Sequence, residues 1–341
     1  MGTKISVEIK KEQDYKQQDP NCCILKYLNS FKINVTKILL LKDGRFAGII
    51  DDRVIIFKRN IESKDIESKD IEFKCSGTPL ELYETQNCHL VVFIKEQKIS
   101  GKVIFFKIIS QFSYKEIFSI NFPLNTYYKD YKIGFEQSKD DGTIILGYSN
   151  KHEKILYLEL YYLLFYKCYN DTYELMRKIE FRLQEANKPI LYILGNEQVL
   201  IKQNQILYFY DFNKSNLIYK YKEKEDNNEI QNIFKYAKNI ILINSLSKTI
   251  LYNWKTRNNI MVIPHTYKLI IHFVIKGIII GHIKDMNGNL KLYFINDKSY
   301  KEMQDLYLKY PPSGIDILSN NDNLYIADLN NHMLLEYKIN I

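Results

Sequence analysis

Short apolar runs separated by polar turns extend along almost the whole chain. Many runs are continuously apolar, as in Val103-Ile104-Phe105-Phe106 and Ile240-Ile241-Leu242-Ile243. A strand with one face in water would alternate apolar and polar residues, so these runs predict strands that are covered on both faces. Several of the turns carry hairpin residues such as Asp43-Gly44, which tolerate the positive φ angles of tight turns. The pattern therefore predicts an all-β protein.

The predicted strands fall into units that repeat along the chain. The first strands of successive units lie roughly 40 to 60 residues apart, the period of four-stranded propeller blades. Six of the units have four strands each. Their strands are Lys37–Leu41, Phe46–Ile50, Val54–Lys58 and Ile71–Cys75; Leu80–Tyr83, His89–Ile94, Lys102–Ile109 and Lys115–Asn121; Tyr131–Glu136, Thr143–Tyr148, Lys154–Leu164 and Tyr173–Phe181; Ile190–Leu194, Gln198–Ile201, Gln205–Phe212 and Leu217–Tyr221; Ile230–Tyr236, Asn239–Asn244, Lys248–Trp254 and Asn259–Ile263; and Lys268–Val274, Gly277–Ile283, Asn289–Ile295 and Tyr300–Leu306.

The last unit is one strand short. Its three strands are Gly314–Leu318, Asn323–Ala327 and His332–Ile339. One strand, Cys22–Leu28, is left over before the first unit, and pairing it with the C-terminal strand would close the ring and remove exposed edges. We therefore predict a seven-bladed β-propeller of four-stranded antiparallel blades over residues 22–341, with residues 1–21 as an N-terminal arm. The segment Leu158–Cys168 stays ambiguous between a short helix and an extended hairpin.

The last unit resembles an NHL repeat. Pro312, Gly314 and Ile315 are similar to that family's Pro-x-Gly-Ile entry into the blade, and Leu324–Asp328 is similar to its second strand. Asn331 and His332 resemble the Asn-His pair that opens the third strand. The resemblance implies structural roles for Gly314, Asp328, Asn331 and His332, in which the buried carboxylate accepts hydrogen bonds from the backbone and holds adjacent strands together.

The other units resemble degenerate WD40 or NHL repeats. Lys42-Asp43-Gly44-Arg45-Phe46 is similar to the turn after the first strand of many WD40 repeats, and Trp254-Lys255 stands where such a repeat has Trp-Asp. The Trp-Asp dipeptide itself occurs nowhere in the chain, and Gly281-His282 falls inside a predicted strand instead of at a blade junction. The resemblance implies a propeller that serves protein–protein interaction.

The charge and the cysteine content predict the character of the surface and the cellular compartment. The net charge is +8, and lysines alternate with carboxylates along the chain, so we expect both signs to be spread over a solvated surface. A basic balance is also compatible with binding to nucleic acid or to an anionic membrane surface.

Five cysteines without a Cys-x-x-Cys pair suggest neither a disulfide framework nor a zinc site. No secretory signal is visible, and the longest apolar run, Leu269–Ile283, is too short and too polar to span a bilayer. We expect a reducing, cytoplasmic compartment.

The first residues fit a myristoylation pattern. Gly2 would be the acceptor, with Ser6 at the favoured position. The alternative is that Ile5, Val7 and Ile9 alternate in a short edge strand or in a disordered arm. A single acyl chain binds membranes only marginally, so membrane association is expected only if Gly2 is acylated, and then weakly.

Motifs for catalysis or cofactor binding are missing from the sequence. It has no phosphate-binding glycine loop, no His-Glu-x-x-His and no Gly-x-Ser-x-Gly, so we expect no cofactor and no enzyme activity. His272 and His282 could face the central channel as metal ligands, or they could be hydrogen-bonded imidazoles of the core. Asp285–Asn289 resembles part of a calcium loop, but it lacks the later bidentate glutamate and also fits a plain hairpin turn.

These observations predict a non-catalytic scaffold that binds other proteins. Partners would contact the face formed by the turns between second and third strands and by the blade junctions. The candidate residues on this face are Asp51, Asp52, Lys95, Glu96, Asn150, Lys151, Gln203, Ser247, Asp285 and Asn330.

Two alternatives stay open. The first is an RNA-binding propeller, because tyrosines beside lysines can stack on single-stranded bases. The second is a hydrolase or lyase with a metal ion held in the channel by residues from several blades. The tyrosines that suggest the first alternative are Tyr127, Tyr128, Tyr131, Tyr161, Tyr162, Tyr166 and Tyr169.

Overall fold

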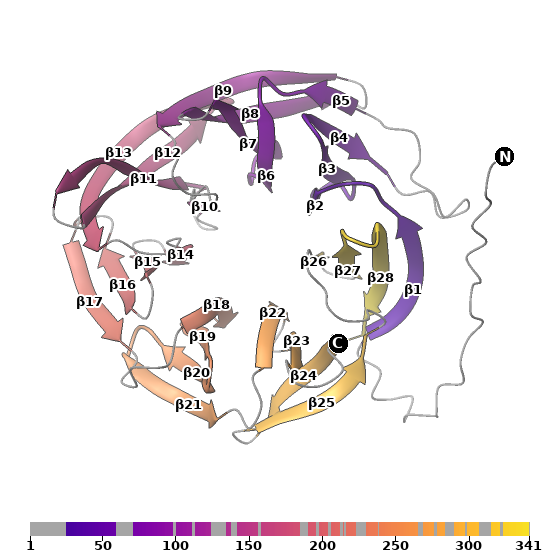
Figure 1. Ribbon diagram of the computed structural model, residues 1–341, viewed down its shortest axis with the longest axis vertical. Coiled ribbons are helices and arrows are strands. Elements are labelled where there is room, and N and C mark those ends of the chain that lie inside the picture. Colours follow the sequence, from indigo (N-terminus) through magenta and orange to yellow (C-terminus); the bar gives the residue numbers. More distant parts are fainter. Residues whose placement is uncertain are drawn as a thin grey trace.

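The computed structural model shows a closed ring of seven four-stranded antiparallel sheets (Figure 1). No helix occurs in the part of the chain that it describes. The described residues are 25–58, 71–97, 100–110, 113–123, 134–137, 142–155, 158–184, 190–195, 198–203, 206–211, 214, 216–222, 230–237, 239–264, 269–275, 278–283, 290–296, 299–306, 315–320 and 323–340.

Each sheet is one blade, and its first strand lies innermost in the ring (Figure 1). Blade 1 contains β2 (Lys37–Leu40), β3 (Phe46–Ile50), β4 (Arg53–Phe57) and β5 (Ile71–Lys74). Blade 2 contains β6 (Thr78–Glu84), β7 (His89–Gln97), β8 (Ser100–Ser110) and β9 (Ser113–Pro123). Blade 3 contains β10 (Gly134–Gln137), β11 (Ile144–Ile155), β12 (Leu158–Tyr169) and β13 (Thr172–Gln184). Blade 4 contains β14 (Ile190–Gly195), β15 (Gln198–Gln203), β16 (Ile206–Asp211) and β17 (Asn216–Lys222).

The remaining blades complete the circle. Blade 5 contains β18 (Ile230–Ala237), β19 (Ile240–Ser245), β20 (Lys248–Asn253) and β21 (Asn258–Pro264). Blade 6 contains β22 (Leu269–Ile275), β23 (Ile278–Ile283), β24 (Lys291–Asn296) and β25 (Ser299–Asp305). Blade 7 contains β26 (Ile315–Ser319), β27 (Asn323–Asp328), β28 (Met333–Ile339) and, from the other end of the chain, β1 (Leu25–Lys32).

The predicted closure of the ring is confirmed. β1 pairs antiparallel with β28, from Leu25 opposite Ile339 to Lys32 opposite Met333. Within the described residues the closing strand is Leu25–Lys32, so it ends four residues later than the predicted Leu28. The ambiguity at Leu158–Cys168 is also resolved, because these residues lie in β12 and pair with β11 and β13 as an extended hairpin.

Among the described residues the apolar core forms seven clusters, and each cluster fills the junction between two neighbouring blades. β8 shows why its apolar run is continuous. Val103 and Phe105 point into the junction with blade 3, whereas Ile104 and Phe106 point into the junction with blade 1. Since successive side chains of a strand face opposite ways, a stretch of strand that is covered by both neighbouring blades is apolar at successive positions.

The turn that begins β3 follows from its residues. Gly44 has a φ of 84°, which favours glycine, and its N–H donates to the carbonyl of Leu41 at 2.9 Å. The Asp43 carboxylate accepts the backbone N–H of Arg45 at 3.0 Å and forms an ion pair with its guanidinium at 2.7 Å. Burial alone would raise the pKa of Asp43, but these bonds to Arg45 lower it below its ordinary value.

Several predictions concern residues outside the described part of the chain. They include the acyl acceptor Gly2, the rest of the arm at residues 1–21, and Gly314 of the NHL-like segment. No helix among the described residues is long and apolar enough to cross a membrane.

Closure by β1 should be essential for stability. The Phe31 side chain is 3% exposed in the cluster between blades 7 and 1. We expect Phe31→Ala to lower the free energy of unfolding by about 3–5 kcal/mol, because it leaves a cavity in that junction. The adjacent exposed Lys32→Ala should change it by less than about 0.5 kcal/mol. Urea denaturation followed by tyrosine fluorescence checks both values, and equal midpoints for the two variants would contradict a structural role for β1.

Candidate interaction surfaces and polar clusters

The ring has two faces that differ in the turns they carry. We call the upper face the one with the turns between second and third strands and the connections between blades. The lower face carries the turns between first and second strands and between third and fourth strands. Since strands alternate in direction within each antiparallel blade, this division holds all around the ring.

Most predicted partner residues lie near the upper face. Asp51 and Asp52 form the turn between β3 and β4, Ser247 lies in the turn between β19 and β20, and Asn330 lies in the turn between β27 and β28. The others fall at or beyond strand ends: Lys95 and Glu96 near the end of β7, Gln203 as the last residue of β15, and Asp285 outside the described residues.

The predicted turn at Asn150 and Lys151 is wrong. Both residues lie inside β11, and Asn150 is opposite Leu160 of β12. The hairpin continues to the Ile155–Leu158 pair, with an irregular register between Asn150 and Ile155. Ser149 and Asn150 are residue types that are common in turns, and this local preference suggested a turn here. Pairing with β12 instead continues to Ile155, because local preference alone does not determine where a paired strand ends.

Blade 1 presents a network of charges near the upper face. Arg53 binds Glu72 at 2.6 Å and lies 3.7 Å from the carboxylate of Asp52. Lys74 binds the other oxygen of Asp52 at 3.1 Å. Asp51 beside them is exposed and has a φ of 51°, a conformation that aspartate tolerates better than most residues. These side chains form a mixed-charge surface over the end of blade 1.

Blade 7 carries the NHL-like turn. One Asp328 oxygen accepts the backbone N–H of Asn331 at 3.1 Å, and the other accepts the Asn331 amide at 2.6 Å. Asp328 is buried, so these bonds satisfy a carboxylate that would otherwise be costly to bury. The carbonyl of His332 accepts the N–H of Ile33 at 2.8 Å. This turn therefore also anchors the connection from β1 into blade 1.

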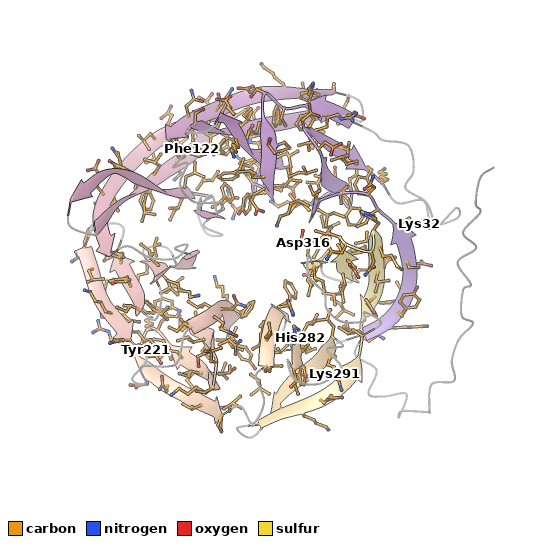
Figure 2. All side chains as sticks on the ribbon, in the orientation of Figure 1. Lys32, Phe122, Tyr221, His282, Lys291 and Asp316 are labelled. Atoms are coloured by element: carbon orange, nitrogen blue, oxygen red, sulfur yellow. The ribbon has the colours of Figure 1, made fainter. Side chains whose placement is uncertain are left out.

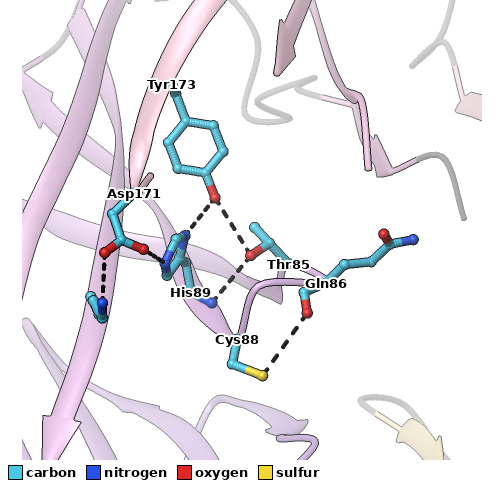
Figure 3. A network of polar contacts seen from close by, with 7 residues as sticks. Thr85, Gln86, Cys88, His89, Asp171 and Tyr173 are labelled. Atoms are coloured by element: carbon cyan, nitrogen blue, oxygen red, sulfur yellow. Dashed lines mark hydrogen bonds and ion pairs between the residues drawn. The ribbon is translucent and has the colours of Figure 1, made fainter. Parts of the chain in front are cut away.

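A polar cluster joins blades 2 and 3 near the lower face (Figure 3). His89, at the start of β7, is 1% exposed, and its Nε2 lies 3.0 Å from Asp171 in the turn between β12 and β13. Its Nδ1 lies 2.7 Å from the hydroxyl of Tyr173 on β13. Lys107 binds the second oxygen of Asp171 at 2.6 Å, and Thr85 accepts the backbone N–H of His89 at 3.1 Å.

The partners of His89 assign its tautomer. An ionised carboxylate only accepts hydrogen bonds, so Nε2 carries the proton toward Asp171, and Nδ1 accepts the O–H of Tyr173. Burial lowers the pKa of His89 despite the opposing effect of Asp171, so the neutral ring is the stable form. Burial also raises the pKa of Tyr173. Both ring nitrogens are thus engaged, and the cluster acts as a clamp between blades.

His272 and His282 form a pair on the adjacent strands β22 and β23 of blade 6. Nε2 of His272 lies 2.9 Å from Nδ1 of His282. Burial, with a smaller contribution from His282, lowers the pKa of His272 to about 4, and burial also lowers that of His282. A neutral hydrogen-bonded pair fits these shifts. Within the described residues, no three or more His, Cys, Asp or Glu side chains are grouped to hold a metal ion.

Charged side chains from three blades meet at the inner strands of the ring. Lys37 of β2 lies 3.5 Å from Glu81 of β6 and 4.0 Å from Asp316 of β26. Asp316 lies on the side of blade 7 that faces the centre (Figure 2). Its second oxygen is buried and makes no hydrogen bond in the structure. Lys37 thus balances two carboxylates from neighbouring blades.

The fold of the chain matches that of solved β-propellers. A chain in a crystal structure of the mitotic checkpoint complex has a TM-score of 0.61 and 9% identity, over 100% of this chain and 99% of that one. The WD40 β-propeller domain of Doa1 has a TM-score of 0.59 and 11% identity, over 92% and 96%. The β-propeller domain of Myceliophteria thermophila Cps50 (Swd1) has a TM-score of 0.58 and 12% identity, over 93% and 100%.

This chain has the fold of the WD40 β-propellers. Neither a protein-family model nor a curated protein matches it in sequence. At such low identities the likeness concerns the fold alone, so residue roles have to come from the contacts within this chain.

The even spread of charge expected from the sequence is wrong for one region. Between Ile230 and Lys284 the chain has no aspartate or glutamate. The same stretch contains eight cations, as many as the net charge of the whole chain: Lys235, Lys238, Lys248, Lys255, Arg257, Lys268, Lys276 and Lys284. A count of acids per predicted blade would have found this signal. By contrast, no local pattern links His89 to Asp171, which lies 82 residues away.

Removal of the Tyr173 hydroxyl tests the clamp. We expect Tyr173→Phe to lower the free energy of unfolding by about 1–3 kcal/mol, because Nδ1 of buried His89 loses its donor. Tyr169→Phe removes an exposed hydroxyl from the same hairpin and should change stability by less than about 0.5 kcal/mol. Urea denaturation measures both changes, and equal effects would exclude a specific bond to His89.

The lowered histidine pKa values predict acid sensitivity. An imidazole in the unfolded chain titrates near pH 6.5, whereas His272 and His282 stay neutral below that value in the fold. Their stabilisation is therefore complete above about pH 6.5 and is lost as the pH falls toward 4. We expect the free energy of unfolding to fall by about 1–2 kcal/mol from this pair between pH 7.5 and 5.

A matched core variant separates this effect from simple destabilisation. Urea denaturation across the pH range should show a flatter pH dependence for His272→Asn combined with His282→Asn than for the unaltered protein. Ile280→Val, on the same strand as His282, should cost about 1 kcal/mol at every pH and leave the slope unchanged. The same slope in all three proteins would refute the assignment.

Proposed function

We propose that this protein is a non-catalytic scaffold that binds other proteins through the upper face of blades 7, 1 and 2. The observation that carries this proposal is the mixed-charge surface over blade 1, where ion pairs link Asp52, Arg53, Glu72 and Lys74. Electrostatic complementarity at such a surface favours specific partners.

Neighbouring blades extend this surface. On blade 2, Glu96 accepts the hydroxyl of Ser76 at 3.0 Å, and on blade 7 the turn held by Asp328 presents Asn330. One of the structurally similar chains comes from the mitotic checkpoint complex, so that propeller occurs within an assembly. The free thiols of Cys75, Cys88 and Cys168 are compatible with the reducing, cytoplasmic compartment that we propose.

The buried histidines favour a scaffold over an enzyme. A general base must reach the proton that it removes, but His89 is 1% exposed and both of its ring nitrogens have protein partners. His272 likewise uses Nε2 to contact His282. These imidazoles stabilise blades and junctions in the described part of the ring.

The tyrosines that suggested RNA binding do not form one exposed group. Tyr166 is buried in the junction of blades 2 and 3, and the Tyr162 ring is covered by Lys178 at 4.3 Å, whereas Tyr169 is exposed. The structure does not describe the side chain of Tyr161. It describes no part of Tyr127, Tyr128 or Tyr131.

Charge removal on the upper face tests the proposed function. We expect Asp51→Asn combined with Glu96→Gln to reduce recovery of protein partners about fivefold, because two charges of the proposed interface are lost while the turn geometry is kept. Affinity purification from native cells with quantitative mass spectrometry measures the recovery. The matched control, Glu174→Gln with Glu180→Gln on outer strand β13, should recover the same partners as the unaltered protein. Partners lost only in the control would place the interface elsewhere.

A further inference from the structure

One outer strand differs from the other six. The outer strand of each blade has only one paired neighbour, so its free edge can pair with another chain. Proteins commonly protect such edges with charged side chains. β1, β5, β9, β13, β17 and β25 all contain Lys, Arg, Asp or Glu, whereas β21 reads Asn-Asn-Ile-Met-Val-Ile-Pro and contains none.

β21 is also exposed in the described structure. Ile260 is 51% exposed and Val262 is 40% exposed, and the two asparagines before them are exposed as well. Two features limit the usable length of the edge. The register with β20 shifts between Leu251 and Tyr252, and Pro264 at the end of β21 has no N–H to donate. A short, apolar, uncharged edge is therefore open to solvent.

Cations stand at the lower end of this edge. The turn before β21 contains Lys255 and Arg257, both exposed. The Asn253 side chain accepts the N–H groups of Lys255 and Thr256 at 3.0 and 3.1 Å, and Arg257 has a φ of 61°. The turn is thus held by its own hydrogen bonds. Lys214, in the corresponding turn of blade 4, is also exposed, but its ammonium lies 4.0 Å from the carboxylate of Asp211.

Blade 5 offers these cations no acidic neighbours of its own. No Asp or Glu occurs from Ile230 to Lys284, so an approaching carboxylate meets no repulsion from this part of the chain. The surface therefore combines two independent properties. Its backbone edge suits an extended chain, and its charge suits an acidic one.

We propose that the free edge of β21 binds an extended acidic segment of a partner protein. The segment adds a fifth strand to blade 5 through backbone hydrogen bonds and packs aliphatic side chains against Ile260 and Val262. Its carboxylates lie beside Lys255 and Arg257. This site is separate from the upper face of blades 7, 1 and 2, so either can fail without the other.

The contacts at this site favour a polypeptide over a nucleic acid. Single-stranded nucleic acid needs exposed aromatic rings on which to stack. The aromatic groups at this turn are already engaged, because Tyr219 donates to the carbonyl of Trp254 at 2.8 Å and its ring is covered by Arg257 at 4.5 Å. The exposed apolar groups are aliphatic, and the edge itself calls for the regular N–H and C=O spacing of a polypeptide.

Binding of a defined peptide to the full-length protein tests the proposal. The probe is a fluorescein-labelled peptide that alternates glutamate and valine over seven residues, the length of β21. We expect anisotropy titration to show binding, and hydrogen exchange to show amide protection in Asn258–Pro264 when the peptide is present. A lysine–valine peptide of the same length should not bind, because it would meet Lys255 and Arg257 with like charge.

Three variants distinguish the contribution of the strand edge to peptide affinity from the contribution of the cations. Val262→Lys places a charge on the edge and should weaken peptide binding about tenfold, and Lys255→Glu should weaken it by a similar factor. Lys220→Glu reverses an exposed lysine on β17, whose ammonium lies over the Tyr208 ring, and should leave the affinity within about twofold. Unchanged melting temperatures establish that the variants are folded.

Several results would overturn the proposal. Peptide binding that is lost in Lys255→Glu but kept in Val262→Lys would show that charge attraction binds the peptide and that it does not pair with the strand edge. Equal binding by a uridine oligonucleotide would indicate a surface for any polyanion. A dimer in light scattering that dissociates in Val262→Lys would mean that a second copy of this chain occupies the edge. Absence of both binding and amide protection would exclude the site altogether.

Discussion

The structure depends on apolar contact between neighbouring blades. Each blade is a single sheet whose two faces are both apolar, and only the adjacent blades can cover them. The seven clusters at the junctions provide this cover, and each full burial of a Leu, Ile or Phe side chain contributes about 1.5–3 kcal/mol. Because every junction needs two blades, the ring must close, and β1 supplies the last strand of the closing blade.

Polar contacts between blades fix the relative position of the blades, which apolar packing alone does not. Lys42 donates to the carbonyl of Thr85 in blade 2, and Lys202 donates to the carbonyl of Gln231 in blade 5. Asn244 of blade 5 donates to the carbonyl of Leu269 in blade 6. Apolar surfaces can slide, whereas a buried hydrogen bond holds only at one relative position. The contacts of His89 with Asp171 and Tyr173 belong to this set, because they join blades 2 and 3.

Much of the fold could be predicted, because strands and turns depend on neighbours in the chain. The blade order, the closing strand and the turn at Asp43-Gly44 were predicted correctly. The turn at Asn150 and Lys151 was not, because the length of a hairpin depends on pairing across β11 and β12. The turns in the sequence predicted which residues lie on the upper face. They did not predict that Asp52 contacts Arg53 and Lys74, because these side chains come from different strands.

The sequence by itself determined the number of blades, their strand order and the acid-free stretch around blade 5, since each is a property of local pattern or composition. The tertiary structure alone decided that His89 meets Asp171 and Tyr173, that His272 pairs with His282, and that β21 is an exposed edge. These facts depend on which segments the closed ring brings together. Contacts between residues far apart in the chain leave no periodic signal in it, because the chain between them is free to vary.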